Sequence, residues 1–452
     1  MKIAIVGWGL EGQSAYEFFG PEHEYLIVNE EPRDDFPAET EKIKLQFVDK
    51  PRQPGLTGNV GDLSYLEGIE AYDKIVYTPT VRKNLEKVFA ADSPFWSKAT
   101  TNQHIFFETV ETKNIIGVTG TKGKGTTSTL ITKFLEASGK KVHLGGNVGR
   151  AVLDFVREVQ QDDWVVLELA NFQLYKFPYS PHIGVCLMLV EEHMEWHPDM
   201  EDYVDAKANI FRWQTAGDVA VYLSGNRYCE QISKLSKGKK VPFYKNPGAY
   251  VRDDGQIVVG KDETQIIDKG EVKLLGEHNL QNVCAAITAV WQIEQKPEVL
   301  ASVLKSFGGL EHRLEFVREL SGVKYYNDSF GTTPDTTIVA MDSFAQPLVL
   351  IVGGHDKEAD YETLATEIIK RSPRHVIAIG QIADRISTAL RKAGFNDITY
   401  GLNTMPEIVA EAHKLAKPGD VVLLSAATSS FGLFKDYKDR GDQFKQAVRA
   451  LA

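Results

Sequence analysis

Short runs of apolar residues, each followed by a glycine or a polar residue, recur along the chain. Runs of this kind are typical of buried strands, whereas apolar residues spaced three and four apart are typical of helices. In the first part of the chain the pattern predicts strands at 2–9, 24–30 and 72–79 and a helix over 10–20. Such alternation of strands and helices indicates a parallel, doubly wound sheet.

The same alternation begins again near residue 113 and near residue 310. A polar, glycine-bearing stretch over 251–273 alternates as antiparallel strands do, and 279–293 has the spacing of a helix. We therefore predict an α/β fold of three tandem α/β domains, at 1–112, 113–309 and 310–452. The expected elements of the last two domains are a helix at 125–139 and strands at 115–120, 140–146, 163–170, 182–189, 216–223, 324–329, 347–354, 375–380 and 420–427.

Length and composition agree with a folded protein of several domains. The chain has 452 residues, 43% of them hydrophobic, which is more than one ordinary core holds. The net charge of −11 argues against a nucleic-acid partner. Cys186, Cys229 and Cys284 are isolated, which favours buried thiols in a reducing compartment. Because the sequence has no signal-peptide pattern and no apolar run of about 18 residues, we expect a cytoplasmic protein without a membrane span. We also expect a monomer.

Two glycine-rich turns follow predicted strands. In the first, Gly7, Gly9 and Gly12 form G-x-G-x-x-G between the first strand and the first helix. A nucleotide phosphate can bind at the amino end of such a helix, and Asn29 with Glu30 would then lie near a ribose. On the residues alone, this motif fits a dinucleotide-binding fold or a tight strand-to-helix turn.

The second turn, GVTGTKGKGTTS over 117–128, departs from the common phosphate-binding loop G-x-x-x-x-G-K-[ST]. Val118 lies where that pattern has its first glycine, and Gly125 follows Lys124 in place of serine or threonine. A glycine-rich turn without a ligand is the alternative, but the strand, the Gly-Lys pair and the hydroxyl residues after it favour a nucleotide site.

The chemistry of this second loop suits a nucleoside triphosphate. Gly120 and Gly123 let the main chain approach phosphate oxygens, and Lys124 adds a full positive charge. Since Gly125 has no side-chain oxygen, Thr126 or Thr127 must supply the hydroxyl for a Mg²⁺ ion.

Acidic and histidine residues follow at positions where metal ligands are common. Glu168 lies late in the predicted strand 163–170, at the edge of the sheet where a Mg²⁺ ligand belongs. His193 and His197 are four residues apart, but Pro198 follows at once and no third ligand is evident, so zinc is disfavoured. His193 fits better as a contact to Mg²⁺ or to substrate.

Asn279 and Asn282 lie three residues apart on one face of a predicted helix. Two carboxamides placed in this way can contact the edge of an adenine, while helix capping is the alternative for Asn279.

Together these motifs resemble the Mur ligases, ATP-dependent amide-forming enzymes of peptidoglycan synthesis that are related to folylpolyglutamate synthase. The family's loop has the form G-x-x-G-T-x-G-K-x-[ST], and residues 117–126 fit it. The resemblance runs through the whole chain and is closest to the glutamate-adding branch. Its further pieces are GGNVG with Asn147, LELANFQ with Glu168, EEHMEWH with His193, DAK with Lys207, GEHNLQN with Asn279 and Asn282, EHRLE with Arg313, YNDS with Asp328, GGHDKEADY with Lys357, and FKDYKDRGDQF after Ser429 and Ser430.

Several positions depart from the family pattern. Gly125 replaces the serine or threonine usual in Mur ligases, as in the folylpolyglutamate branch. Thr80 replaces a glycine, and Phe330 replaces the lysine usual after NDS. ELANFQ replaces the commoner ELSSFQ, and SAATSSFGLF lacks the usual SPA.

The resemblance implies a Rossmann-like N-terminal domain for a UDP-sugar, a central P-loop ATPase domain and a Rossmann-like C-terminal domain for an amino acid. It implies ATP and Mg²⁺ as cofactors and a carbamylated Lys207, since an ammonium group beside two Mg²⁺ ions would be repelled. The implied catalytic residues are Lys124, His193 and Lys207, and the implied metal contacts are Thr126, Glu168, His193 and Lys207. The implied ATP contacts are Gly120, Thr121, Gly123, Lys124, Gly125, Thr126, Thr127, Asn279, Asn282, Arg313 and Asp328; the UDP-substrate contacts are Gly9, Leu10, Glu11, Asn29, Thr78 and Asn147; the amino-acid contacts are Lys357, Ser429, Ser430 and Tyr437.

The implied reaction activates a carboxylate. The carboxylate of UDP-N-acetylmuramoyl-L-alanine attacks the ATP γ-phosphate, and the amine of glutamate then displaces phosphate from the acyl phosphate. D-glutamate is favoured as acceptor, with L-glutamate as the main alternative and a folylpolyglutamate-type ligase as the nearest rival. An NAD-dependent oxidoreductase would leave the second loop unexplained, and Lys124, Glu168 and His193 argue against a non-catalytic nucleotide sensor.

Overall fold

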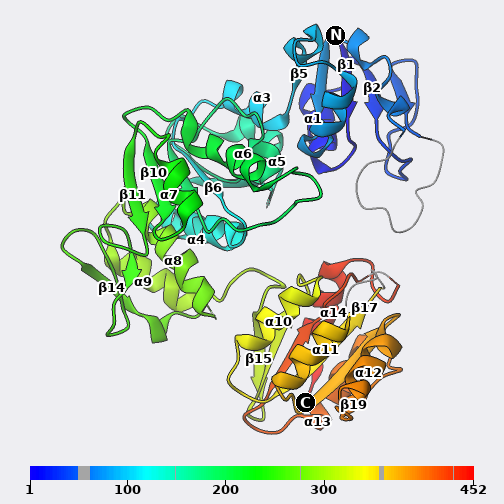
Figure 1. The fold of residues 1–452 in the computed structure, drawn as a ribbon, viewed down its shortest axis with the longest axis vertical. Helices are drawn as coiled ribbons and strands as arrows, with labels where there is room; N and C mark the ends of the chain where they lie inside the picture. The colour runs from blue at the N-terminus through cyan, green and yellow to red at the C-terminus, as the bar shows by residue number, and fades with distance from the viewer. Residues whose placement is uncertain (49–61, 148, 275, 356–360, 431) are drawn as a thin grey trace. The chain divides into compact units, whose positions relative to one another are not determined.

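The computed structural model describes residues 1–452 apart from 49–61, 148, 275, 356–360 and 431. Its contacts divide the chain into two compact units. Unit 1 comprises Met1–Lys269 and Gln281–Val303, and unit 2 comprises Gly270–Leu280 and Leu304–Ala452. Each unit is built of sheets covered by helices (Figure 1).

The first sheet of unit 1 has five parallel strands in the order β3-β2-β1-β4-β5 (Figure 1). Strand order reverses at β1, so the carboxyl ends of β1 and β4 lie side by side, which is where ligands bind in such sheets. Its elements are β1 (Lys2–Val6), α1 (Leu10–Phe19), β2 (Glu24–Val28), β3 (Ile43–Gln46), β4 (Lys74–Tyr77), η3 (Pro79–Val81), α2 (Arg82–Val88), β5 (Ala99–Thr100) and α3 (Asn102–Thr109).

The second sheet of unit 1 has six parallel strands in the order β11-β10-β9-β6-β8-β7. Every residue of β6 and of β8 is buried, because these apolar runs lie inside the sheet between covering helices. Its elements are β6 (Ile115–Thr119), α4 (Lys124–Ala137), β7 (Val142–Gly146), β8 (Trp164–Glu168), α5 (Asn171–Leu174), β9 (Ile183–Cys186), α6 (Met200–Arg212), β10 (Val219–Leu223), α7 (Arg227–Ser233) and β11 (Lys239–Phe243).

A small antiparallel sheet follows, as the alternation over 251–273 predicted. Its strands are β12 (Tyr250–Val251), β13 (Gln256–Val259) and β14 (Thr264–Asp268), in that order. Helices α8 (Glu277–Val290) and α9 (Pro297–Ser306) come next, and α8 confirms the helix predicted there.

The sheet of unit 2 has six strands in the order β15-β16-β20-β17-β18-β19, parallel except for β15. Leu350 and Val352 belong to one apolar cluster and Val349 and Ile351 to another, so helices cover both faces. Its elements are β15 (Glu315–Leu320), β16 (Val323–Asp328), α10 (Pro334–Asp342), β17 (Leu348–Gly354), α11 (Tyr361–Lys370), β18 (His375–Gly380), α12 (Ala383–Lys392), β19 (Ile398–Thr399), α13 (Met405–Leu415), β20 (Val421–Ser425) and α14 (Tyr437–Ala450).

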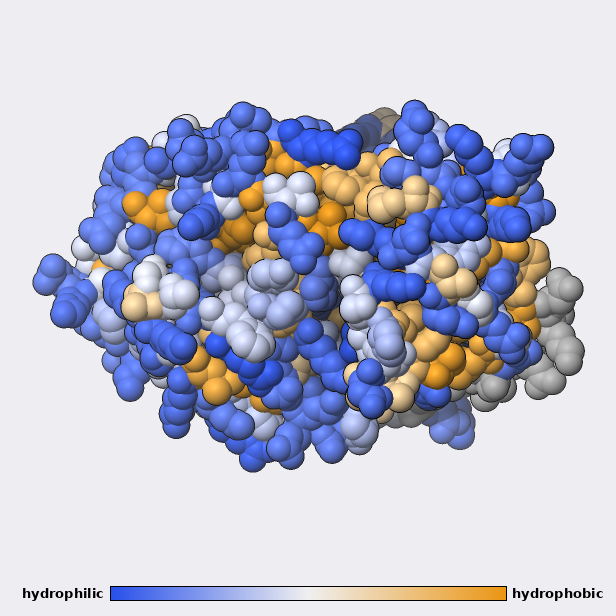
Figure 2. Space-filling model, turned by 90° about the horizontal axis from the view of Figure 1, so that it is seen from above, coloured by the Kyte–Doolittle hydropathy of each residue, from blue (hydrophilic) through white to orange (hydrophobic). Residues whose placement is uncertain are grey.

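The predicted α/β class with parallel sheets is confirmed. Strand β15 was not predicted, because its residues alternate between half-buried and exposed and form no continuous apolar run. The face in Figure 2 is mostly hydrophilic, with apolar side chains gathered in small groups. Within the part of the chain that the structure describes, no helix combines the length and the apolar character needed to cross a membrane.

Candidate functional site

The glycine-rich loop of residues 120–123 connects the end of β6 to the start of α4. Gly123 has φ +86°, which side chains rarely tolerate, and a Cβ there would collide with the side chain of Asn282. The Thr121 amide donates to the Met188 carbonyl oxygen at 2.8 Å, and its hydroxyl donates to the Val190 carbonyl oxygen at 3.1 Å. These bonds hold the loop open at the amino end of α4, where a phosphate group can bind.

Two lysines share one carbonyl oxygen of this loop. Lys124 Nζ lies 3.0 Å from the Gly120 oxygen and 3.0 Å from the Thr121 oxygen. Lys207 Nζ, from α6, lies 2.9 Å from the same Gly120 oxygen and 3.3 Å from the hydroxyl of Thr119. Burial, and next the charge of Lys124, lower the pKa of Lys207 well below its usual range. Lys124 thus brings positive charge to the loop, where an anion could bind, whereas Lys207 is shifted toward its neutral form.

The hydroxyl residues predicted to face Mg²⁺ lie in the first turn of α4. Thr126 keeps 4% of its surface exposed and Thr127 none. Among the described residues, the Thr127 hydroxyl has no hydrogen-bond partner. The Ser128 hydroxyl, by contrast, donates to the carbonyl oxygens of Lys124 and Gly125 within the helix.

Glu168 ends β8, the strand paired with β6. Asn147, just beyond β7, donates its side-chain amide to Glu168 Oε1 at 2.9 Å and its main-chain amide to the Glu168 carbonyl oxygen at 3.0 Å. The structure therefore brings a predicted metal ligand into contact with a predicted UDP-substrate residue.

His193 lies in a tight turn and has φ +60°, unusual for a residue with a side chain. Its Nδ1 lies 3.1 Å from Glu195 Oε1, and its ring centroid lies 5.0 Å from that of Phe172. His197 closes the turn, with its amide 2.9 Å from the His193 carbonyl oxygen. Burial lowers the pKa of His197, which favours its neutral form.

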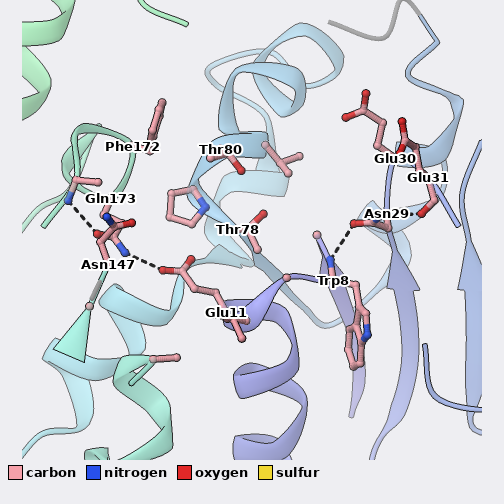
Figure 3. A pocket seen from close by; sticks show the side chains of 18 of the residues that line it. Trp8, Glu11, Asn29, Glu30, Glu31, Thr78, Thr80, Asn147, Phe172 and Gln173 are labelled. Atoms are coloured by element: carbon pink, nitrogen blue, oxygen red, sulfur yellow. Dashed lines mark hydrogen bonds between the residues drawn. The ribbon is translucent and has the colours of Figure 1, made fainter. Parts of the chain in front are cut away.

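A cavity of about 500 Å³ opens at the carboxyl ends of β1 and β4 (Figure 3). The structure brings all six predicted UDP-substrate residues into its lining: Gly9, Leu10, Glu11, Asn29, Thr78 and Asn147. Asn29 accepts a hydrogen bond from the Trp8 amide at 2.9 Å, which fixes the loop after β1. A Cβ on Gly7, at φ +97°, would collide with the Thr78 side chain, so only glycine fits there.

Glu11 lies in the wall of this cavity and is held by two side-chain amides. Its Oε1 accepts hydrogen bonds from Gln103 at 2.6 Å and from Gln173 at 2.8 Å. Figure 3 shows the bond from Gln173. Burial raises the pKa of the Glu11 carboxyl, although these two amides partly oppose that effect.

Sequence reasoning missed several lining residues of this cavity, including Trp8, Thr80, Phe172 and Gln173. Phe172 and Gln173 belong to LELANFQ, in which only Glu168 was predicted as a site residue. Their signal was an aromatic and a carboxamide directly after a strand end in a parallel sheet, where ligands bind.

Family comparisons match both units. Residues 118–290 match the family described as Mur ligase middle domain, and residues 312–428 match Mur ligase, glutamate ligase domain. A Clostridium tetani protein named UDP-N-acetylmuramoylalanine–D-glutamate ligase is 32% identical over 459 residues, covering 100% of this chain and 97% of that protein. The chain belongs to the Mur ligase family. A protein of the same name from Acetivibrio thermocellus is 36% identical to this Mur ligase over 398 residues, covering 86% and 84% of the two chains.

Solved structures agree with this Mur ligase in fold. MurC from Thermotoga maritima has a TM-score of 0.59 at 18% identity, covering 100% of this chain and 99% of its own. MurF from the same organism, in complex with ADP, has a TM-score of 0.57 at 15% identity, with coverages of 100% and 95%. At these identities the likeness bears on the fold alone.

Unit 2 of this Mur ligase places Asp328 at the carboxyl end of β16. Its carboxylate accepts hydrogen bonds from the Ser425 hydroxyl at 2.8 Å and from the Leu314 amide at 3.2 Å. Burial raises the pKa of Asp328 to about 7, against the opposing effect of these bonds. Arg440, fully buried in α14, donates to the Ser329 hydroxyl at 2.8 Å and to the Ser329 carbonyl oxygen at 2.9 Å.

The other predicted residues of unit 2 that the structure describes are Arg313, Ser429, Ser430 and Tyr437. The Arg313 guanidinium lies over the ring of Phe330 at 4.3 Å, and the Tyr437 ring packs edge-on against Phe330 at 5.2 Å. Ser429 and Ser430 are buried, and within the described ranges the Ser429 hydroxyl has no hydrogen-bond partner. Lys357 lies outside the described residues.

The two predicted adenine residues lie on helix α8 of the Mur ligase. The Asn282 side chain lies against Gly123 of the phosphate loop. Asn279 lies one turn earlier, with its amide bonded to the Gly276 carbonyl oxygen at 2.9 Å, so the first turn of α8 is capped by the main chain.

Proposed function

We propose that this Mur ligase joins D-glutamate to UDP-N-acetylmuramoyl-L-alanine in an ATP-dependent reaction of peptidoglycan precursor synthesis. The observation that carries the proposal is Asn147, which lines the nucleotide-sugar cavity and also bonds to Glu168 beside the phosphate loop. A nucleotide-sugar site and a triphosphate site thereby meet at one side chain. The names of the relatives support the D-enantiomer of glutamate.

The residues of unit 1 fit ATP and Mg²⁺. The glycine-rich loop leads into the amino end of α4, Lys124 brings a positive charge, and a buried hydroxyl at Thr127 lacks a partner among the described residues. Thr126 or Thr127, with Glu168, would hold a Mg²⁺ ion, and His193 would help to hold a second. Bound there, Mg²⁺ would neutralise charge on the phosphates during transfer.

Lys207 is proposed to carry a carbamate. Burial lowers the pKa of the Lys207 amine, which increases its unprotonated fraction, and only the unprotonated amine attacks CO₂. In that step the Nζ–C bond forms and one proton leaves the nitrogen. The product would be an anion on a long stem, which would offset the charge of Lys124 and could orient the metal ions.

The chemistry is then positioning and charge stabilisation. The substrate carboxylate attacks the γ-phosphorus and ADP leaves; the glutamate amine attacks the acyl carbon and phosphate leaves. Gly9, Leu10, Glu11, Asn29 and Thr78 would hold the UDP part.

Helix α8 and residues of unit 2 would supply the remaining contacts. Asn279, Asn282, Arg313 and Asp328 are proposed for the nucleotide, and Lys357, Ser429, Ser430 and Tyr437 for the carboxylates of glutamate. The proposal assigns the UDP-sugar to 1–112, ATP to 113–309 and the amino acid to 310–452. It includes a monomeric, cytoplasmic enzyme, and the net charge of −11 supports a role without nucleic acid.

The test is release of phosphate with UDP-N-acetylmuramoyl-L-alanine, ATP and each amino acid in both enantiomers. We expect turnover with D-glutamate, and a raised KM for glutamate in Lys357→Ala with little change in the KM for ATP. Turnover with L-glutamate alone would correct the enantiomer. No turnover with either enantiomer would refute the assignment of glutamate as the acceptor. ADP release with another amino acid would still support the ATP-dependent activation of the substrate carboxylate.

A further inference from the structure

His197 is a buried imidazole with two directional hydrogen bonds. Its side chain is 0% exposed. The Asn171 side-chain amide lies 2.8 Å from Nε2, and Asp202 Oδ2 lies 2.6 Å from Nδ1. Because the Asn171 nitrogen can only donate, Nε2 accepts and Nδ1 carries the hydrogen that Asp202 accepts. Both nitrogens are therefore satisfied in one neutral tautomer.

These two bonds tie together three segments that carry proposed metal-site residues. Asn171 follows Glu168 by three residues at the start of α5. Asp202 precedes Lys207 by five residues on α6. The His197 main chain closes the turn of His193, whose positive φ needs such support.

The same turn also contacts the nucleotide-sugar cavity. Trp196 Nε1 donates to the carbonyl oxygen of Thr80 at 3.2 Å, and the Trp196 ring centroid lies 5.0 Å from that of Phe172. Thr80 and Phe172 both line the cavity. Displacement of the turn would therefore disturb the wall of the cavity as well as His193.

A cation from α2 completes the arrangement. Lys83 Nζ lies 3.1 Å from Asp202 Oδ2 and above the rings of Tyr175 at 4.4 Å and Trp196 at 4.9 Å. Lys83 follows η3, whose residues line the cavity. Asp202 therefore accepts one hydrogen bond from Lys83, beside the cavity wall, and one from His197, beside the proposed metal-site residues.

We propose that His197 is a positioning residue for the ligase reaction: held by Asn171 and Asp202, it sets the place of His193 relative to Glu168 and Lys207. The inference rests on the proposed function. It requires no proton transfer by His197. An apolar side chain of similar volume would fill the space, but it would leave Asn171 and Asp202 without this partner and the turn without its anchor.

The experiment compares three variants of the full chain: His197→Leu, Asn171→Ala and a control, His143→Leu. His143 is a matched imidazole, because its Nε2 lies 2.9 Å from Asp163 Oδ2 and its ring stacks on Phe155. It lies near the amino-terminal end of β7, away from the carboxyl edge where Glu168 lies.

Two readouts are taken beside the thermal midpoint. The first is kcat and KM for each substrate, where we expect kcat to fall about 10- to 100-fold in His197→Leu, since small misplacements of reacting groups cost this much. The second is the Kd of Mn²⁺ with a non-hydrolysable ATP analogue, measured by electron paramagnetic resonance. We expect it to weaken about tenfold, as outer-shell changes usually do. The KM for glutamate should hardly change.

Asn171→Ala should reproduce both effects, and the double variant should lose no more than the larger single loss, because the two residues act through one bond. Wild-type kcat and Mn²⁺ affinity in folded His197→Leu or Asn171→Ala would overturn the proposal. So would equal losses in the His143→Leu control, which would indicate a general effect of packing. If the wild type itself were inactive on the muramoyl substrate, the proposed function would fail, whereas the Mn²⁺ comparison would still decide the role of His197.

Discussion

Each unit buries a basic side chain near the carboxyl edge of a parallel sheet, but the surroundings of the two differ. Lys207 in unit 1 shares the Gly120 oxygen with Lys124, and burial together with that like charge lowers its pKa well below the usual range. Arg440 in unit 2 is bonded to Ser329 and lies near Asp328; burial lowers its pKa only to about 10, and Asp328 opposes the effect.

This difference indicates different roles: Lys207 suits a predicted anion-binding site, whereas Arg440 suits a structural role in the fold. A guanidinium keeps its charge when buried and can hold several oxygen atoms in a fixed plane, as Arg440 does. A lysine ammonium loses its proton more readily, and next to another cation it favours a bound anion or a chemical modification.

Removal of Lys124, which is half-buried at the start of α4, should nearly stop the reaction. We expect Lys124→Ala to lower kcat by roughly 10²–10³, because one preorganised charge at a developing anion is worth that much. Phosphate release measures the effect, and an unchanged thermal midpoint shows that the fold persists. Lys133→Ala is the control on the same helix, since Lys133 pairs with Glu136 at the surface. Near-normal kcat in folded Lys124→Ala would refute the assignment of the loop.

Loss of Lys207 should cost one to two orders of magnitude in kcat, the usual range for a group that orients metal ligands. If a carbamate is the active form, a small carboxylate such as acetate should restore part of the activity of Lys207→Ala. Native mass spectrometry of the wild type should show one extra CO₂ that acid removes. Wild-type activity in Lys207→Ala without added carboxylate would contradict the modification.

In unit 2, the buried carboxyl of Asp328 should make the stability of the fold depend on pH. The pKa of Asp328 is raised to about 7 in the folded state, so the folded protein binds a proton that the unfolded chain has released. That stabilisation is complete below about pH 4 and disappears as pH rises through about 7. We expect the isosteric Asp328→Asn variant to gain roughly 2 kcal/mol over the wild type between pH 5 and pH 8. Urea titrations at both pH values measure it, and parallel curves for the two proteins would exclude the effect.

The smallest effect concerns the first turn of α4. The ligase pattern places the Mg²⁺ hydroxyl at Thr126, which retains some exposure, whereas Thr127 is wholly buried. We therefore expect Thr126→Val to raise the Mg²⁺ concentration for half-maximal activity about tenfold and Thr127→Val to raise it less. Mg²⁺ titration of both variants decides the ranking. The reverse order would assign the metal to the Thr127 hydroxyl, which lacks a described partner.

The sequence predicted those parts of the molecule that are determined locally. The fully apolar runs became β6 and β8, and the glycine spacing identified the loop where positive φ is needed. The six residues predicted to contact the UDP-substrate meet in one cavity because carboxyl ends of parallel strands share one edge.

The parts that were missed depend on tertiary contact. Strand β15 is half-exposed and pairs antiparallel, so its sequence has no apolar run. The bond between Asn171 and His197 joins residues 26 positions apart, and no spacing rule predicts it. Glu11 was identified as a substrate contact, yet its bonds to Gln103 and Gln173 depend on α3 and α5 packing beside α1.

The hydrogen bond from Trp196 to Thr80 ends on a main-chain oxygen. Every residue type offers that oxygen, including the glycine usual at this position in Mur ligases. The residue type at position 80 can therefore change during evolution without loss of the hydrogen bond from Trp196. Residue pairs that change together would not disclose the bond, and a mutational scan of position 80 would leave it intact. Only substitution of the donor, Trp196, would expose this connection between the nucleotide-sugar cavity and the His193 turn.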